Sequence, residues 1–132
     1  MPAIVVVEDD RVGLLADIAA MLGKARINIE SVNVDVVANK AVVTLTLADV
    51  KNAKRLLETA GHHVEDDDSI VVKLSDKPGE LARITELLSK AGINLDRVHT
   101  LSRDGKNTML SMKTSDSKKA AVILKDYLVT AQ

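Results

Sequence analysis

The chain contains two copies of one segment of about 65 residues. With an offset of 66, residues 4–34 align without a gap to residues 70–100, and 14 of these 31 positions are identical. The identical pairs include three polar or turn-forming residues, Asp10, Gly13 and Asn28, which match Asp76, Gly79 and Asn94. Internal repetition predicts two copies of one small module. We therefore expect module 1 in residues 1–67 and module 2 in residues 68–132.

The second halves of the two copies align with an offset of 67. Asp49 then matches Asp116, and Leu57 matches Leu124. Module 2 must therefore carry one extra residue. We expect it within Ser102–Asn107, because turn residues cluster there and loop tips tolerate insertions.

Each module begins with a strand followed by an amphipathic helix. Ile4–Val7 is a short β-branched run, which is typical of a strand. Apolar residues then recur at helical spacing, which predicts helices near 10–23 and 76–91. The expected buried face is Leu15, Ile18, Leu22 and Ala25, repeated as Leu81, Ile84, Leu88 and Ala91. Gly92 is placed to end the second helix, whereas Arg26 at the matching position indicates that the first helix ends in another way.

The rest of each module adds two strands, a second helix and a short last strand. Ile29–Val37 and Ala41–Leu47 read as strands, and Asp49 is expected to cap a helix that ends at Gly61. His63–Glu65 is expected to form a fourth strand, repeated near 129–132. The order βαββαβ predicts an α+β fold, with an antiparallel sheet that carries two helices on one face.

Composition excludes several classes of partner. The net charge is −1 with interspersed signs, so we expect no nucleic acid and no anionic membrane surface as partners. The chain has one Tyr and no Phe or Trp, which leaves little for stacking bases. It has no cysteine, and no apolar run approaches the roughly 20 residues of a membrane span. These features are typical of a cytoplasmic protein.

The stretch DKPGELARITELLSKAGINLDRV, which begins at Asp76, resembles the opening of an ACT domain. The first copy, DDRVGLLADIAAMLGKARINIESV, has the same frame. The resemblance implies two tandem modules of ferredoxin-like fold that cover almost the whole chain, with no catalytic domain attached. It also implies regulatory binding of a small molecule, most often an amino acid, at the interface of paired modules.

Carried over to this sequence, the resemblance implies a ligand site in the loop between the first strand and the first helix. In module 2 the residues are Asp76, Lys77, Pro78, Gly79, Glu80 and Leu81, with Asn94 expected nearby. In module 1 they are Asp10, Arg11, Val12, Gly13, Leu14 and Leu15, with Asn28. A glycine lets a ligand approach the backbone, and a helix N-terminus favours a carboxylate. Because Val12 and Arg26 depart from the family pattern, module 2 is the better candidate.

The same loop residues also have a purely structural interpretation. Asp76 could cap the helix, Pro78 could start it and Gly79 could make the turn, without any ligand. Asn28 and Asn94 could simply satisfy backbone groups at the start of a strand.

Other polar clusters do not predict a metal or a cofactor. His62 and His63 are adjacent on an expected strand and would point to opposite faces, so these and His99 are expected to be exposed or strand-edge residues. The acidic run Glu65–Asp68 is expected to be a solvated connection between the modules. We therefore expect neither metal nor cofactor.

The sequence lacks the common motifs of nucleophilic, metal-dependent and nucleotide-dependent enzymes, so a catalytic function is not expected. The favoured function is a regulatory sensor of a small molecule, an amino acid above all. The alternative is a ligand-free interaction module that docks onto an enzyme or another partner. In both cases a homodimer or a higher even oligomer is expected.

Overall fold

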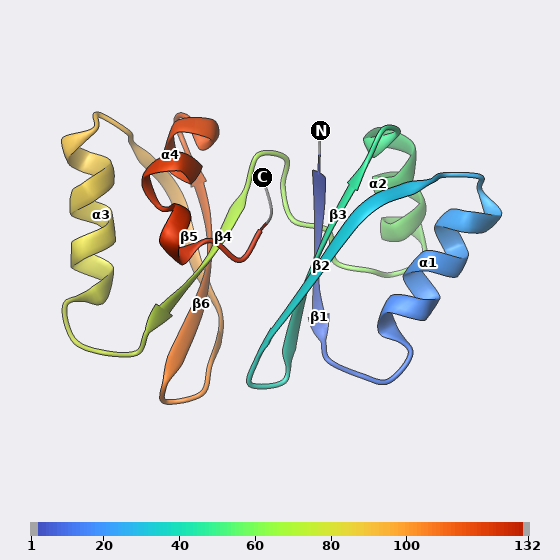
Figure 1. The fold of residues 1–132 in the computed structure, drawn as a ribbon, viewed down its shortest axis with the longest axis horizontal. Helices are drawn as coiled ribbons and strands as arrows, with labels where there is room; N and C mark the ends of the chain where they lie inside the picture. Colours follow the sequence, from blue (N-terminus) through green and yellow to red (C-terminus); the bar gives the residue numbers. More distant parts are fainter. Residues whose placement is uncertain (1–2, 131–132) are drawn as a thin grey trace. The chain divides into compact units, whose positions relative to one another are not determined.

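The structure is a computed structural model that describes residues 3–130, and this part divides into two compact units, residues 3–67 and 68–130. Both units have the same order of elements (Figure 1). Module 1 consists of β1 (Ala3–Asp9), α1 (Leu14–Lys24), β2 (Ile29–Val37), β3 (Lys40–Leu47) and α2 (Val50–Thr59). Module 2 consists of β4 (Ile70–Ser75), α3 (Glu80–Lys90), β5 (Leu95–Arg103), β6 (Asn107–Thr114), α4 (Ser117–Ile123) and a short 3-10 turn, Lys125–Tyr127. The predicted α+β fold is confirmed.

Each module has an antiparallel sheet of three strands. Its second and third strands in chain order form a hairpin, and the third strand lies in the middle of the sheet. The strand order is β1-β3-β2 in module 1 and β4-β6-β5 in module 2. The expected fourth strand is reduced to one antiparallel bridge, Val6 with Val64 in module 1 and Val72 with Leu128 in module 2. In module 1 it is supported by a hydrogen bond from the Val7 N–H to the His63 carbonyl, 3.0 Å. Of the strand expected near 129–132, residues 131 and 132 lie outside the described residues.

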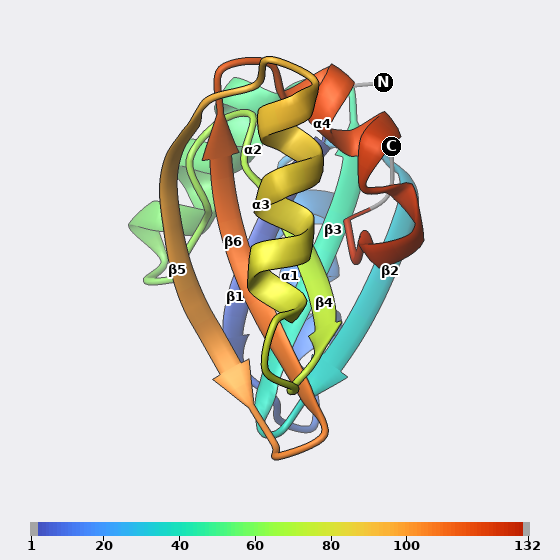
Figure 2. The same cartoon turned by 90° about the vertical axis from the view of Figure 1, so that its left-hand side faces the viewer.

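The core of each module lies between its helices and one face of its sheet. In module 2, α3 lies across the sheet (Figure 2), and Ile84 and Leu88 of this helix are buried against Val72 and Met112. The equivalent residues of α1, Ile18 and Leu22, are buried in module 1. This packing follows from the helical spacing of the apolar residues, because positions three and four apart share one helix face.

The expected buried face was wrong at its first position in both modules and at its last position in module 1, whereas Ala91 at the last position in module 2 packs against the core. Leu15 and Leu81 are 38% and 49% exposed, and Ala25 is exposed as well. The helices begin at Leu14 and Glu80, about four residues later than expected, because a turn precedes each of them. Leu15 and Leu81 therefore lie beside that turn and not over the sheet.

The ends of α1 and α3 are alike, although the sequence predicted a difference. Gly92 follows the end of α3 with a φ of 74°, and Arg26 at the matching position of α1 also adopts a positive φ, 60°. The N–H groups of Ile27 and Ile93 both return to the carbonyl of a leucine five residues earlier, at 2.9 Å. The expectation that α1 ends in another way is therefore wrong, because Arg26 adopts the left-handed backbone that a glycine provides at lower cost.

Arg26→Gly is expected to raise the free energy of unfolding by about 0.5–1 kcal/mol, because relief of the left-handed strain exceeds the entropy that a glycine loses on folding. Gly92→Ala should lower it by a similar amount, since no heavy atom lies within 4 Å of the added Cβ and only the backbone is strained. Gly23→Ala is the control, because Gly23 lies in α1 without a positive φ, and this change should stabilise. Urea denaturation measures all three. Destabilisation by Arg26→Gly would contradict the interpretation.

The extra residue of module 2 is not at the tip of the hairpin. Thr100 pairs with Leu110, but Ser102 pairs with the next residue back, Met109, so Leu101 bulges out of the β5–β6 ladder. In module 1 the corresponding pairs, Val34 with Val43 and Asp35 with Val42, run without a shift. The insertion is therefore a β-bulge, which re-aims the side chains that follow it.

Candidate functional site

The loop before α3 is a tight turn built by its own sequence. The Glu80 N–H donates to the Lys77 carbonyl at 3.3 Å, and Gly79 has φ 90° and ψ −11°. These values describe a type II turn, which favours proline at its second position and glycine at its third. Lys77-Pro78-Gly79-Glu80 fits that preference, so the loop is preformed.

Module 1 forms the same turn from a different sequence. The Leu14 N–H donates to the Arg11 carbonyl at 3.3 Å, and Gly13 has φ 88° and ψ −2°. Val12 occupies the position of Pro78 and is fully exposed. The departure from the family pattern therefore leaves the shape of the loop unchanged.

Val12→Pro is expected to stabilise the protein by about 0.4–1 kcal/mol, because proline restricts the unfolded chain at a position whose native backbone suits it. Pro78→Val is the matched change in module 2 and should destabilise by a similar amount. The midpoints of urea denaturation measure both. A loss of stability in Val12→Pro would show that the two turns differ.

The helices that follow these turns start without a side-chain cap. Neither α1 nor α3 has a cap hydrogen bond, although Asp10 and Asp76 lie only a few residues before them. By contrast, Asp49 caps α2 through the Asn52 N–H at 3.3 Å, and Asp116 caps α4 through the Lys119 N–H at 3.1 Å. The interpretation that Asp76 is a helix cap is therefore wrong. The Glu80 N–H closes the turn, so the N–H groups of Leu81 and Ala82 are the ones in the first turn of α3 that could bind a ligand, with the positive end of the helix dipole behind them.

A hollow of about 190 Å³ lies beside the turn of module 2. We call it the module 2 hollow; its lining residues are Leu74, Ser75, Asp76, Lys77, Glu80, Leu81, Thr100, Arg103, Thr108 and Leu110. Four of the six residues expected from the loop line it, together with residues of the β5–β6 hairpin. Its volume is below the roughly 300 Å³ at which pockets for drug-sized ligands begin, so it suits a ligand smaller than a drug-sized molecule.

The equivalent hollow of module 1, about 310 Å³, has a different chemistry. Its lining residues are Asp10, Arg11, Gly13, Leu14, Leu15, Ala16, Val34, Ala41 and Val43. The strand pairs equate Val34 with Thr100, Ala41 with Thr108 and Val36 with Arg103. The module 1 hollow is therefore apolar where the module 2 hollow is polar and charged.

Arg103 joins the hairpin to the loop in module 2. Its Nη2 donates to the Asp76 Oδ1 at 2.9 Å, and the Asp76 N–H donates to the Lys106 carbonyl at 2.9 Å. The β4–α3 loop and the hairpin lie at the same end of the module in Figure 2. The sequence did not predict Thr100, Arg103 and Thr108 as residues of the site. The one feature of the sequence that pointed to this region was the extra residue of module 2, which lies close to Arg103.

Two carboxyl groups close to the hollows are held in their charged form. A hydrogen bond from Lys40, 2.8 Å, and its positive charge keep the pKa of Asp9 below the ordinary value of 3.8. The backbone N–H groups of Asn107 and Lys106 do the same for the pKa of Asp104 at the hairpin tip. At neutral pH the Asp104 carboxylate therefore accepts hydrogen bonds at the tip of the β5–β6 hairpin, and the Asp9 carboxylate pairs with Lys40 between β1 and β3.

Asn94 and Asn28 do not join the loops of their own modules. The Asn94 N–H donates to the Ser115 Oγ at 2.9 Å, and its carbonyl accepts from the Ser115 N–H. Ser115 follows the end of β6, whereas Asp76 lies beside the start of β6, so the two lie at opposite ends of the sheet. The expectation that Asn94 lies near the loop was wrong, because α3 carries the chain along the whole length of the sheet before β5 begins. Asn28 occupies the same position before β2.

Two of the histidines and the first residue of the acidic run form contacts within module 1. His62 is bonded to Glu8 and largely buried, and the His63 Nε2 lies 2.5 Å from the Glu65 Oε2. His62 is thus not an exposed residue, and Glu65 is not part of a solvated connection, because both belong to the segment that bridges β1. Within residues 3–130, no group of three or more histidine and acidic side chains could hold a metal ion.

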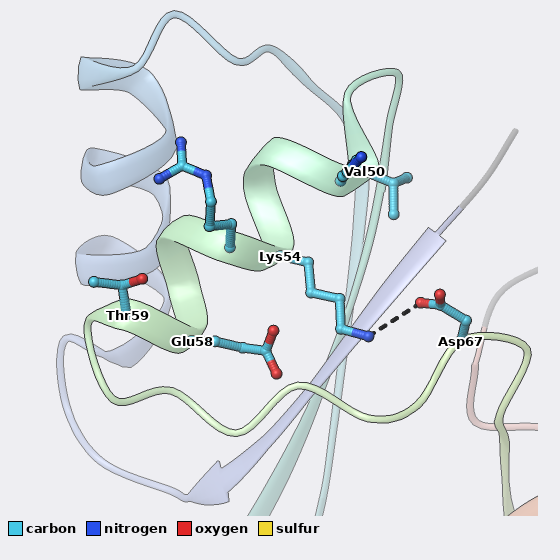
Figure 3. A pocket seen from close by; sticks show the side chains of 7 residues that line it. Val50, Lys54, Glu58, Thr59 and Asp67 are labelled. Carbon is cyan, nitrogen blue, oxygen red and sulfur yellow. Dashed lines mark hydrogen bonds and ion pairs between the residues drawn. The ribbon is translucent and has the colours of Figure 1, made fainter.

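A third hollow, about 630 Å³, lies on the outer side of α2. Figure 3 shows Lys54 reaching from this helix to Asp67, and the Nζ of Lys54 lies 3.3 Å from the Oδ1 of Asp67. Arg55, which also lines it, donates to Asn52 at 2.5 Å. The charges of Lys54 and Arg55 are thus engaged within the chain, so this surface is a weaker candidate than the two hollows beside the turns.

The repeated βαββαβ topology and the repeated turn define two tandem regulatory-type modules of ferredoxin-like fold. The chain belongs to the ACT family: the ACT domain matches residues 3–60 and again residues 69–127. No curated protein matches the sequence. No helix among the described residues is long and apolar enough to cross a membrane.

The chain is similar to several solved structures over nearly its whole length. A protein from Bacteroides thetaiotaomicron is 18% identical, with 96% of this chain and 89% of that chain covered and a TM-score of 0.48. The regulatory subunit of aspartate kinase from Thermus thermophilus is 14% identical over 93% and 87%, with a TM-score of 0.45. The small subunit of acetolactate synthase from Thermotoga maritima is 12% identical over 96% and 88%, with a TM-score of 0.39.

Proposed function

We propose that this protein is a regulatory sensor that binds a free amino acid in module 2 and has no catalytic activity of its own. The bound residues are those of the β4–α3 loop, Asp76–Leu81, together with Arg103. The observation that carries the proposal is the uncapped N-terminus of α3, which opens into a small hollow with charges of both signs.

The chemistry of the hollow complements an α-amino acid. The first-turn N–H groups of α3 suit a carboxylate. The carboxylate of Asp76 has capacity for an ammonium group beside its bond with Arg103, because a carboxylate accepts about four hydrogen bonds. Gly79 has no Cβ, so the ligand can lie close to the backbone. The module 1 loop, Asp10–Leu15, is proposed as a second site for a more apolar ligand.

A thermal-shift screen of the full chain with the twenty amino acids, read with an external dye, tests the proposal. A ligand that binds only the folded state stabilises it by about 2.7 kcal/mol at a hundredfold excess over Kd. We expect a rise in Tm with one amino acid or a few related ones, and titration calorimetry should then give one site per chain for that ligand. No shift and no heat with any amino acid would contradict the proposal.

A second candidate function is self-association through β2, with a homodimer as its simplest product. β2 is an edge strand, and its alternate residues Val32, Val34 and Val36 are between 41% and 47% exposed. Exposed apolar edge strands favour pairing with another chain, and inward-pointing charges prevent it. In module 2 the strand pairs place Val98, Thr100 and Arg103 at the corresponding positions of the edge strand β5, so two of the three apolar side chains are replaced by polar or charged ones.

Sedimentation of the natural protein and of Val34→Lys at tens of micromolar tests this association. The natural protein should sediment as a dimer or a higher even oligomer, and the variant should shift towards the monomer. His99→Lys, on the corresponding edge of module 2, is the control and should leave the distribution unchanged. A monomeric natural protein would contradict this second function.

A further inference from the structure

We infer that the module 2 hollow selects an acidic amino acid, one that carries a second carboxylate in its side chain. This inference rests on the proposed function and names the ligand class of the same site. Its basis is the balance of charges in the hollow, and in particular the positions of Lys77 and Arg103.

The two acidic side chains of the hollow are already compensated. Asp76 is paired with Arg103 at 2.9 Å, and Glu80 is paired with Arg83, which lies outside the hollow, at 3.5 Å. Lys77 also lines the hollow, and no described residue forms an ion pair with it. After these pairings the hollow carries one uncompensated positive charge.

Hydrogen-bond donors also remain. Arg103 uses one of its five N–H groups on Asp76 and is 63% exposed, so the rest of its guanidinium group can turn towards a ligand. Thr100 and Thr108 line the same hollow, and each carries a hydroxyl group that can donate a hydrogen bond. A zwitterion satisfies the helix N-terminus and Asp76, but it leaves Lys77 without an anion and the other N–H groups of Arg103 without an acceptor. A side-chain carboxylate completes the set, and arginine suits it because its planar fork matches a carboxylate.

The structure also shows how module 2 acquired this preference. Arg103 follows the bulge at Leu101, which is the residue that module 1 lacks, and the position of Arg103 is held by Val36 in module 1. Thr100 and Thr108 are replaced there by Val34 and Ala41. One inserted residue and the substitutions at these three positions therefore give the hairpin side of the hollow a polar and charged lining in module 2 and an apolar one in module 1, while both loops contribute an aspartate and a basic residue.

Titration calorimetry of the full chain with glutamate and glutamine, and with aspartate and asparagine, tests the inference. Each pair has nearly the same shape and differs in one charge. In the natural protein we expect one of the acids to bind about 10- to 100-fold more tightly than its amide, the effect of one or two charge-assisted hydrogen bonds. Raising the salt concentration should reduce this preference, because exposed charges are screened.

The decisive variant is Arg103→Val, which installs the residue that module 1 has at the equivalent position. The ratio of the two affinities should fall towards one, while the affinity for the amide should change by less than about threefold. Lys77→Gln should reduce the ratio in the same direction and leaves the Arg103–Asp76 pair in place. Arg11→Gln, at the position of Lys77 in module 1, is the control and should leave the ratio unchanged. Far-UV circular dichroism verifies that each variant is folded.

The outcomes separate this inference from the proposed function. If the natural protein binds an amide as tightly as its acid, or binds only a neutral or basic amino acid, the acidic preference is wrong and amino acid binding stands. If Arg103→Val and Lys77→Gln both keep the full preference, the inference is equally wrong. If no amino acid binds at all, the proposed function fails, and this inference fails with it.

Discussion

Gly79→Asp is expected to weaken ligand binding to module 2 by on the order of 100-fold, because at least one charge-assisted hydrogen bond is lost and a like charge is added. Gly79 is the residue immediately before α3, so the new carboxylate would lie beside the N–H groups of the first turn of α3. It would thus occupy the place proposed for the ligand carboxylate, and its negative charge would repel that carboxylate.

The same change should alter stability little. No heavy atom lies within 4 Å of a Cβ at Gly79, so the substitution meets no protein atom, but its φ of 90° strains any other residue. That strain costs about 1–2 kcal/mol, and the attraction between the new carboxylate and the positive end of the α3 dipole offsets about 0.3–1 kcal/mol of it. Far-UV circular dichroism and thermal unfolding should therefore remain close to those of the natural protein.

Gly13→Asp provides the matched control for binding. Gly13 has nearly the same backbone angles and also precedes its helix directly, so the structural cost is the same. Calorimetry with the ligand of module 2 should show full affinity in Gly13→Asp and almost none in Gly79→Asp. Full affinity in Gly79→Asp would exclude the loop as the binding site.

Ile84→Ala is expected to lower the free energy of unfolding by about 2–5 kcal/mol. The side chain of Ile84 is completely buried between α3 and the sheet, so its truncation leaves a cavity that the strands on the other side do not fill. A domain of this size has a total stability of only a few kcal/mol. Ile18→Ala, at the equivalent position of α1, should have a comparable effect.

Leu81→Ala is the control for this prediction, because Leu81 was expected in the core from its spacing and is half exposed in the structure. Its truncation should cost well under about 1 kcal/mol, since surface substitutions usually fall within about 0.5 kcal/mol. Denaturation in urea with an unchanged m-value gives both numbers. Equal costs for Ile84→Ala and Leu81→Ala would show that the helix presents the face expected from the sequence and not the one observed.

Local sequence patterns predicted most of the fold. The strand expected at Ile29–Val37 is β2 with the same bounds, and the helical spacing of Ile18 and Leu22 predicted the part of α1 that is buried. The patterns failed at the starts of α1 and α3, where residues that were expected in the helix form a turn instead. Asp76 and Pro78 read equally well as the start of α3, and only the positive φ of Gly79 shows that the chain turns first. A backbone angle of this kind depends on the hydrogen bond that closes the turn, and residue type alone does not specify that bond.

The loop of the candidate site could be predicted from the sequence, but the residues that the β5–β6 hairpin contributes could not. The D-x-P-G-x-L motif identified Asp76–Leu81, four residues of which line the module 2 hollow. Arg103 lies 27 residues after Asp76, and no local pattern joins them. For Asn94 the prediction was wrong. The family resemblance implied that Asn94 lies near the loop, but the length of α3 places it at the other end of the sheet.

The sequence by itself determined that the protein is a duplicated α+β module. Hydrophobic periodicity is a local property that each copy shows on its own, and comparison of the two copies reveals the repeat. Only the tertiary structure decided that the two copies differ in chemistry. Strand pairing sets which residues of the hairpin face the loop, and a single bulge at Leu101 shifts that register by one residue. The bulge brings Arg103 to Asp76 in module 2, whereas the unshifted ladder of module 1 places Val36 at the same position.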